Sequence, residues 1–364
     1  MRLLVLLTLS LLFAIQVMRR FLPSSVECNT KRKAERNKDS ITIITVPAAT
    51  ANTSAAEDLA FHSWLALSPR PFVVLVASTT TVAHLEAVAH LHNGVIVAEL
   101  PLGSGYALDH VPSLPAVIST AEAAAPTDIL AFVNADVLLG PSFAAAALAC
   151  AVDDRALVMT GARRDCAPPR SLSSAAAWER LSAARQSSDP FAAAASTFRC
   201  TPHPPTGKDY FVFERGFWDR AGGIPAFGIG WKQGAAYDNF LLELALRRGE
   251  VVDASAVVDA LHIDHAKAHL DSHGRRLKIT PDQMLNLRLS RAALMRHGVN
   301  QSQALRGLTT DAPLLLCPRA CAGGDEEQQA LQIVARRDVS GGQCSCALSE
   351  VQSPRRSNST KGEG

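Results

Sequence analysis

Short apolar, β-branched runs alternate with helix-like stretches from about residue 41 onward. Helices are expected around 55–67, 82–92, 114–125 and 142–152. The runs that predict the intervening strands are ITIITV (41–46), PFVVLVAS (71–78), GVIVAEL (94–100), DILAFVNADVLL (128–139) and ALVMTGA (156–162). Strands that alternate with helices are parallel and covered on both faces. The pattern therefore predicts an α/β fold whose ligands bind beyond the carboxyl ends of the strands.

The second half of the chain is less regular. It combines a strand at 209–213, a Gly-rich loop at 222–234, an amphipathic helix from Asn239 to Arg248 and an apolar run with a His-rich sequel at 251–265. A helix over 281–297 is expected to end the folded domain, which we place at 41–308. Composition turns to Gly, Ser and charged residues beyond Thr309, so 309–364 is expected to be a Cys-containing accessory or disordered tail.

The N-terminus begins with an apolar run from Leu3 to Met18, bounded by Arg2 and the pair Arg19-Arg20. Its length is at the short edge of what spans a bilayer as a helix. We expect 1–22 to be a signal anchor, with a cleaved signal peptide as the alternative. The charged segment 23–40 then predicts a short stem.

Sequons at Asn52, Asn300 and Asn358 and a total of eight cysteines indicate an oxidising, lumenal compartment. The positive-inside rule points the other way, because more Lys and Arg follow the apolar run than precede it. We expect a single-pass type II protein of the Golgi or ER membrane with a lumenal catalytic domain, or a secreted protein. The cluster Cys317, Cys321, Cys344 and Cys346 fits a disulfide-linked tail, or a zinc site of irregular spacing.

Composition excludes several classes of protein. Lys plus Arg number 36 against 34 Asp plus Glu, so no charge excess indicates nucleic acid as a partner. Aromatic residues make up 5% of the chain and charged residues 19%, which argues against a polytopic membrane protein and a disordered chain. Gly103 and Gly105 lack the rest of a dinucleotide fingerprint, and P-loop, nucleophile-elbow and kinase signatures are absent.

The segment VNADV (133–137) ends an apolar strand abruptly in polar residues. Residues i and i+2 of an extended chain point to the same side, so Asn134 and Asp136 can face one ligand together. Such oxygen donors suit Mg²⁺ or Mn²⁺, which are commonly held by one or two carboxylates and substrate phosphates. The alternative is that Asp136 only caps the following turn.

His262, Asp264, His265 and His269 follow a second apolar strand. One histidine could complete a metal site begun by Asp136, although any of them could equally be an exposed loop residue. Asp238 lies at the start of the amphipathic helix. It could cap that helix, or act as a general base toward an acceptor hydroxyl.

Taken in order, these segments resemble a nucleotide-diphospho-sugar glycosyltransferase family of the GT-A fold found in algae, plants and bacteria. The resemblance spans roughly residues 41 to 275. It is carried by ITIITVP, FHSWLALSP (61–69), DILAFVNADVLLGPSF (128–143), TGARRD (160–165), TGKDYFVFERGFW (206–218), IPAFGIG, YDNFLLELALRRG (237–249) and VVDASAVVDALHIDH (251–265). It implies a GT-A-like (Rossmann-like) mixed, mostly parallel sheet flanked by helices.

The resemblance also implies roles for particular residues. Asn134-Ala135-Asp136 would stand where the family has an Asp-x-Asp-type motif that binds a divalent metal, Mn²⁺ or Mg²⁺, with His262 or His265 as the late ligand. Asp136 is the foremost candidate, whereas Asn134 replaces a carboxylate and would contribute to donor binding. The basic residues Arg163, Arg164 and Lys208 would bind the donor or its phosphates, and Lys208 would also line the acceptor side. Asp209 would be a catalytic residue on the acceptor side, and Asp238 would be the base if the reaction inverts the anomeric centre.

The implied function is transfer of a sugar from a nucleotide-sugar donor to an acceptor hydroxyl on a glycan, protein or small molecule. Two segments depart from the family pattern: LGSGYALDH (102–110) and IGWKQG, which contains Trp231 and Lys232. Alternatives are a metal-dependent hydrolase or nucleotidyltransferase that uses the same residues, and a non-catalytic sugar-binding pseudoenzyme. Neither the donor sugar nor the acceptor follows from the sequence.

Overall fold

The computed structural model describes residues 37–47, 55–101, 106–108, 111–151, 157–168, 174–204, 208–225, 237–248, 250–263, 312–318 and 331–335, and single helical positions between 284 and 296. The chain divides into the units Met1–Asn37 and Lys38–Gly364, and the fold below is that of the second unit. The apolar run at Leu3–Met18 lies outside the described residues. Among the helices that are described, none has the length and apolar character needed to cross a bilayer.

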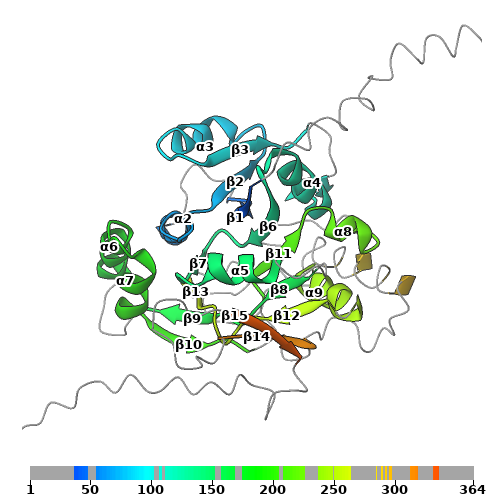
Figure 1. The fold of residues 1–364 in the computed structure, drawn as a ribbon. Coiled ribbons are helices and arrows are strands. Elements are labelled where there is room, and N and C mark those ends of the chain that lie inside the picture. The colour runs from blue at the N-terminus through cyan, green and yellow to red at the C-terminus, as the bar shows by residue number, and fades with distance from the viewer. Residues whose placement is uncertain are drawn as a thin grey trace, which may run out of the picture. The chain divides into compact units, whose positions relative to one another are not determined.

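The main sheet contains most of the described strands. Their bounds are β1 Asn37–Thr45, β2 Phe72–Ala77, β3 Val95–Glu99, β6 Thr127–Val133, β8 Val158–Thr160, β11 Tyr210–Glu214, β12 Val251–Asp253, β14 Leu314–Pro318 and β15 Leu331–Ala335. Within the described residues they form a nine-stranded sheet in the order β15-β14-β12-β8-β11-β6-β1-β2-β3 (Figure 1). β2 pairs in parallel with β1 and β3, and β12 pairs in parallel with β8 and β14. β11 runs antiparallel to both β6 and β8. The mixed, mostly parallel sheet expected from the sequence is thus confirmed.

A second, four-stranded sheet among the described residues contains β7 Val137–Leu139, β9 Arg164–Ala167, β10 Arg199–Pro202 and β13 Ala260–Ile263, in the order β10-β9-β13-β7. Three of these strands directly follow strands of the main sheet along the chain: β7 follows β6, β9 follows β8, and β13 follows β12. The expectation of one strand at 128–139 was therefore wrong, because the turn at 134–136 separates β6 from β7. The run at 251–265 likewise contains two strands, β12 and β13, which residues 254–259 separate. The short strands β4 Tyr106–Leu108 and β5 Val111–Pro112 form a separate pair.

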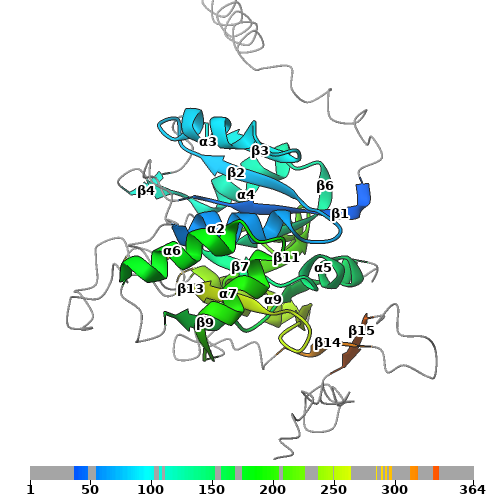
Figure 2. The same cartoon turned by 90° about the vertical axis from the view of Figure 1, so that its left-hand side faces the viewer.

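Helices cover both faces of the main sheet. Their bounds are α2 Ala55–Leu65, α3 Val82–Ala89, α4 Leu114–Ala124, α5 Phe143–Ala151, α6 Ser174–Arg185, α7 Pro190–Thr197, α8 Phe217–Arg220 and α9 Tyr237–Arg248. One buried cluster includes residues of α2, α5, α6 and α7, and the other includes residues of α4, α8 and α9. Figure 2 shows α2, α6 and α7 gathered together, in agreement with their mutual contacts.

The period-two pattern of the strands explains why both faces are apolar. In β2, Val73 and Leu75 belong to one buried cluster, whereas Val74 and Val76 belong to the other. Successive side chains of a strand point to opposite faces, so a strand that is covered on both sides must be apolar at every position. The continuous apolar runs in the sequence reflect this burial.

Two boundaries differ from the expected ones. β14 and β15 come from the segment expected to be an accessory tail, yet they extend the main sheet, and Leu316 is fully buried there. β1 begins at Asn37, inside the segment expected to be a stem. Most of the helix expected at 281–297 lies outside the described residues.

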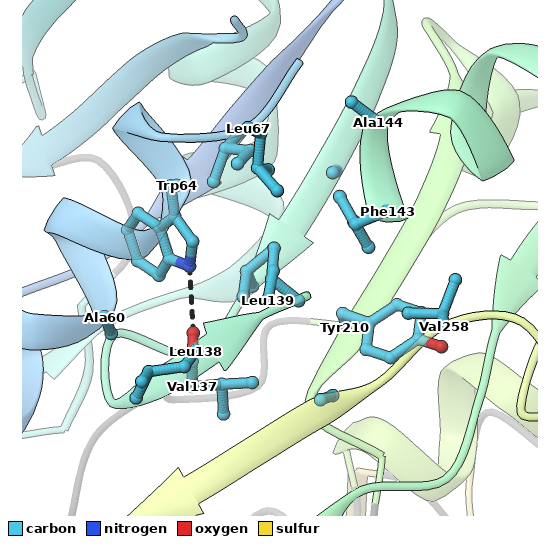
Figure 3. Packing of buried hydrophobic residues seen from close by; sticks show 14 of the residues in the cluster. Ala60, Trp64, Leu67, Val137, Leu138, Leu139, Phe143, Ala144, Tyr210 and Val258 are labelled. Carbon is cyan, nitrogen blue, oxygen red and sulfur yellow. Dashed lines mark hydrogen bonds between the residues drawn. The ribbon is translucent and has the colours of Figure 1, made fainter. Parts of the chain in front are cut away.

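α2 anchors β7, the strand that leaves the main sheet after β6. The Trp64 indole Nε1 donates a 2.8 Å hydrogen bond to the Val137 carbonyl oxygen (Figure 3). One residue earlier, the Ser63 hydroxyl accepts a 3.2 Å hydrogen bond from the Leu139 backbone N–H. Since all these groups are buried, the first residue of β7 has a fixed position, and so does the turn before it.

Candidate active site

The turn between β6 and β7 contains Asn134, Ala135 and Asp136. The Val137 N–H donates a 3.2 Å hydrogen bond to the Asn134 carbonyl, which closes a four-residue turn with Asp136 at its third position. β6 and β8 run in the same direction, because β11 lies antiparallel between them. Their carboxyl ends therefore meet the beginning of β11, so that Asn134, Arg163 and Asp209 approach one another.

Asn134 and Asp209 are bonded twice. The Asn134 backbone N–H donates to the Asp209 carbonyl at 2.9 Å, and the Asn134 side-chain Nδ2 donates to Asp209 Oδ1 at 2.7 Å. On the other side of the amide, the Tyr237 hydroxyl donates to Asn134 Oδ1 at 3.0 Å. Burial first, and then the charges of Asp238, Asp209 and Asp136, raise the pKa of Tyr237, although the hydrogen bond to Asn134 acts the other way. The phenol therefore stays protonated and remains a donor.

Arg163 joins two carboxylates. Its Nη1 donates to Asp209 Oδ2, and its Nε donates to Asp165 Oδ1 at 3.0 Å. Burial lowers the pKa of Arg163, but the charges of Asp209, Asp165 and Asp136 outweigh this effect and raise it overall. Its side chain is only 15% exposed, so the guanidinium is committed to protein carboxylates rather than presented to solvent.

Asp136 and His262 meet across the second sheet. The register of β13 places His262 beside Val137 of β7 on one side and Asp165 of β9 on the other. His262 Nε2 lies 3.2 Å from Asp136 Oδ2, and His262 Nδ1 lies 3.5 Å from Asp165 Oδ1. The pairing of Asp136 with a late histidine that the sequence suggested is thus present as a contact with His262. His265 lies outside the described residues.

Asp165 and His203 also belong to the site, although neither is among the residues expected from the sequence. Asp165 Oδ2 lies 2.6 Å from His203 Nδ1, and His203 follows β10. Burial raises the pKa of Asp165, but His203, Arg163 and His262 together lower it overall. A signal for Asp165 was available, because it lies two residues after Arg163 and so on the same side of an extended chain. His203 carried no such signal.

A disulfide links the strands that carry these residues. Cys166 of β9 and Cys200 of β10 are bonded and lie opposite each other in the strand register. The next register pair joins Thr201 with Asp165. The spacing of the eight cysteines leaves many pairings open, so the sequence alone does not predict this disulfide.

Lys208 and Asp238 belong to a neighbouring group. Lys208 is 2% exposed, and its Nζ donates to Asn239 Oδ1 at 3.3 Å. Asn239 Nδ2 in turn donates to Asp238 Oδ1 at 3.4 Å. Asp238 and Asn239 lie in the first turn of α9, where the helix dipole stabilises a carboxylate. Asn239 was not among the expected site residues.

Arg164 does not join the group formed by Arg163. Its Nη2 lies 3.5 Å from Asp259 Oδ1; the Arg164 side chain is partly exposed and that of Asp259 is largely exposed. Consecutive residues of a strand point to opposite faces, which explains why Asp165 belongs to the site while Arg164 points away from it.

The donor atoms present suit part of a divalent metal site. Among the described residues, no group of three or more His, Cys, Asp or Glu side chains is arranged to hold a metal ion. Asp136 Oδ2 and His262 Nε2, at 3.2 Å, have about the separation of adjacent ligands on an octahedral ion whose bonds are about 2.1 Å long. These two residues therefore fit as two ligands of Mn²⁺ or Mg²⁺.

No protein-family model and no curated protein matches this sequence. Solved structures similar to this chain include S. aureus TarS in complex with UDP-GlcNAc, at 11% identity and a TM-score of 0.44, over 72% of this chain and 68% of TarS. GalNAc-T7 with UDP, GalNAc and Mn²⁺ is 13% identical, with a TM-score of 0.43, over 63% of this chain and 44% of that one. The mannosyltransferase PcManGT from Pyrobaculum calidifontis, in complex with GDP-Man and Mn²⁺, is 13% identical, with a TM-score of 0.40, over 72% and 66%. This chain spans less than half of GalNAc-T7, and such low TM-scores decide nothing about its chemistry.

Proposed function

We propose that the protein transfers a sugar from a nucleotide-sugar donor to an acceptor hydroxyl, assisted by a divalent cation. The observation that carries this proposal is the 3.2 Å contact between Asp136 and His262 beyond the carboxyl end of β6. Ligands of α/β sheets bind in this region. A carboxylate and an imidazole there would suit a metal that also binds the phosphates of a donor.

Asp136 and His262 would hold Mn²⁺ or Mg²⁺, and His265 remains a candidate for a further ligand. When bound, the cation would neutralise charge that develops on the departing nucleoside diphosphate. Arg163 would contribute indirectly. Because its guanidinium already binds Asp209 and Asp165, we propose that it positions these carboxylates and does not contact the donor phosphates itself.

Asp238 is the better candidate for the general base. Both oxygens of Asp209 already accept a hydrogen bond within the protein, Oδ1 from Asn134 and Oδ2 from Arg163. Asp238 is partly exposed at the start of α9, with the amide of Asn239 3.4 Å from its Oδ1. If the reaction inverts the anomeric centre, Asp238 would accept the proton of the acceptor hydroxyl.

We propose a lumenal or extracellular location for the catalytic domain. The Cys166–Cys200 disulfide supports this location, because disulfides persist in oxidising compartments, and Cys317 is also disulfide-bonded. A type II signal anchor at Leu3–Met18 would then tether the domain to a Golgi or ER membrane.

The test of the proposed function is turnover. The full chain is incubated with Mn²⁺, a panel of UDP- and GDP-sugars and simple glycoside acceptors, and both nucleoside diphosphate and glycosylated acceptor are quantified. Asp238→Asn is expected to lower transfer at least about 100-fold. Glu243→Gln, which removes one charge from the next turn of α9, serves as the matched control and should stay close to wild type. Release of free sugar without acceptor product would instead identify a hydrolase.

A further inference from the structure

Asn134 and Asp209 lie side by side at the ends of neighbouring antiparallel strands. Tyr210 pairs with Val133 in the register of β11 and β6, so the next pair outward is Asp209 with Asn134. We infer that these two residues act as one amide–carboxylate unit, which accommodates a single negative charge and positions the turn that carries Asp136. The inference deepens the proposed function, but its first test requires neither metal nor donor.

The Asn134 amide is hydrogen-bonded at both ends, and the bond to Asp209 sets its orientation. The Asp209 carboxylate accepts the 2.7 Å hydrogen bond from Nδ2, and the Tyr237 hydroxyl donates the 3.0 Å hydrogen bond to Oδ1. A carboxylate only accepts, so the reversed amide would place its oxygen against Asp209 Oδ1 and lose that bond, whereas the Tyr237 hydroxyl can donate to an oxygen or accept from an N–H. Asn134 thus uses both polar atoms of its side chain in contacts within the protein.

The positive charge beside the unit is not sufficient to compensate a second carboxylate. Asp209 is 6% exposed, and the cation beside it is Arg163, which it shares with Asp165. An aspartate at position 134 would place an acceptor oxygen where Nδ2 now donates to Asp209. A partly buried carboxylate at position 134 and the buried carboxylate of Asp209 would then lie within hydrogen-bond distance without a proton between them. Asparagine at this position is therefore complementary to Asp209.

The unit controls the position of Asp136 through the backbone. Asn134 is the first residue of the turn closed by the Val137 N–H, and Asp136 is the third. The Asn134 N–H is also bonded to the Asp209 carbonyl. Side-chain and backbone bonds together fix the turn against β11. Asn134 is accordingly a positioning residue, and Asp136 is the residue of the Asn-Ala-Asp segment that faces His262.

A different role for Asn134 gives the opposite prediction. If Asn134 were a weakened metal ligand, substitution by aspartate would add charge to the metal site and tighten binding of Mn²⁺. If Asn134 is the partner of Asp209, the same substitution disrupts the turn and does not tighten binding. Exchanging both residues restores one amide and one carboxylate in the pair.

The experiment compares full-length wild type with Asn134→Asp, Asp209→Asn and the double variant. Glu179→Gln on the exposed side of α6 is the control for loss of one negative charge. Thermal unfolding is measured in EDTA, and Mn²⁺ binding is measured by electron paramagnetic resonance without donor. Asn134→Asp is expected to lower the unfolding midpoint by at least about 5 °C, and the double variant to recover most of that loss. Glu179→Gln should change the unfolding midpoint little.

In the Mn²⁺ titration, Asn134→Asp is expected to bind no more tightly than wild type, and the double variant to return to within about threefold of wild type. Tighter Mn²⁺ binding by Asn134→Asp would overturn the inference. So would a decrease in the unfolding midpoint of the double variant that equals the sum of the decreases in the two single variants. If wild type binds no Mn²⁺, the proposed function fails, whereas the unfolding data in EDTA still decide whether the two residues form a unit.

Discussion

His262 Nε2 lies 3.2 Å from Asp136 Oδ2, although Asp136 precedes β7 and His262 lies in β13, more than 100 residues later. The antiparallel register of β13 and β7 places His262 opposite Val137, the residue after Asp136. The parallel register of β13 and β9 places Asp165 on the other side of the same imidazole. The pairing of β7, β13 and β9 in the small second sheet therefore brings Asp136, His262 and Asp165 together.

Gly161 is required by the close approach of Tyr210. A Cβ at Gly161 would overlap the Tyr210 hydroxyl oxygen and lie 3.1 Å from the Ser255 backbone nitrogen. Gly161→Ala is expected to cost about 1–3 kcal/mol in the free energy of unfolding, because the buried phenol must move. The cost is measured by urea denaturation.

Tyr210→Phe provides the matched test of that explanation. The Tyr210 hydroxyl is buried and finds no hydrogen-bond partner within the described part of the chain, so its removal alone should be close to neutral. In the Gly161→Ala background it should recover much of the lost stability. Equal losses with and without the hydroxyl would show that the Ser255 backbone or the Tyr210 ring, and not the hydroxyl, limits the space at Gly161.

Asp165 should make stability depend on pH in the acid range. Its folded-state pKa is lowered, so its ionised form contributes stability that is present above the unfolded-state pKa of about 4 and is lost as pH falls through the lower folded value. Asp165→Asn is expected to cost about 1–3 kcal/mol at pH 7, with the difference shrinking toward pH 3. Denaturation at a series of pH values measures this difference in the free energy of unfolding. Asp259→Asn, at a largely exposed carboxylate, is the control, and a difference that grows toward acid pH would contradict the assignment.

The Cys166–Cys200 disulfide should stabilise both the fold and the site. It closes a loop with a sequence separation of 34, for which loop-closure entropy corresponds to about 3–4 kcal/mol. A reductant, or the double substitution of both cysteines by alanine, should lower the unfolding midpoint. Because β10 leads to His203, the substituted protein should also show a smaller effect of His203→Ala on stability than wild type does. Full additivity of the two changes would show that the disulfide does not position His203.

The sequence predicted the main sheet well where strands are buried on both faces. Continuous apolar runs marked β1, β2, β3, β6 and β8, because most positions in these strands are buried or partly buried. The short strands of the second sheet were missed or merged with others. β9 contains the charged residues Arg164 and Asp165 and has no apolar run, so nothing local in Arg164–Ala167 marked it as a strand.

Site prediction from the sequence succeeded for side chains at strand ends and failed for those that depend on register. Asp136 and His262 follow or end apolar runs, so their approach could be expected. Asp165 and His203 are brought in by the pairing of β9 with β13 and β10, which the sequence does not reveal. The role of Asp209 was also hidden, because its partners Asn134 and Arg163 come from two other strand ends.

The most direct test of the proposed function is Mn²⁺-dependent binding of a donor. Thermal unfolding of the full chain is measured with a panel of nucleotide sugars, each with Mn²⁺ and with EDTA, for wild type and Asp136→Ala. We expect one class of nucleotide sugar to raise the unfolding midpoint of wild type only when Mn²⁺ is present, and not to raise that of Asp136→Ala. A donor that stabilises both proteins equally, or no shift with any donor in folded wild type, would contradict a donor site built on Asp136 and His262.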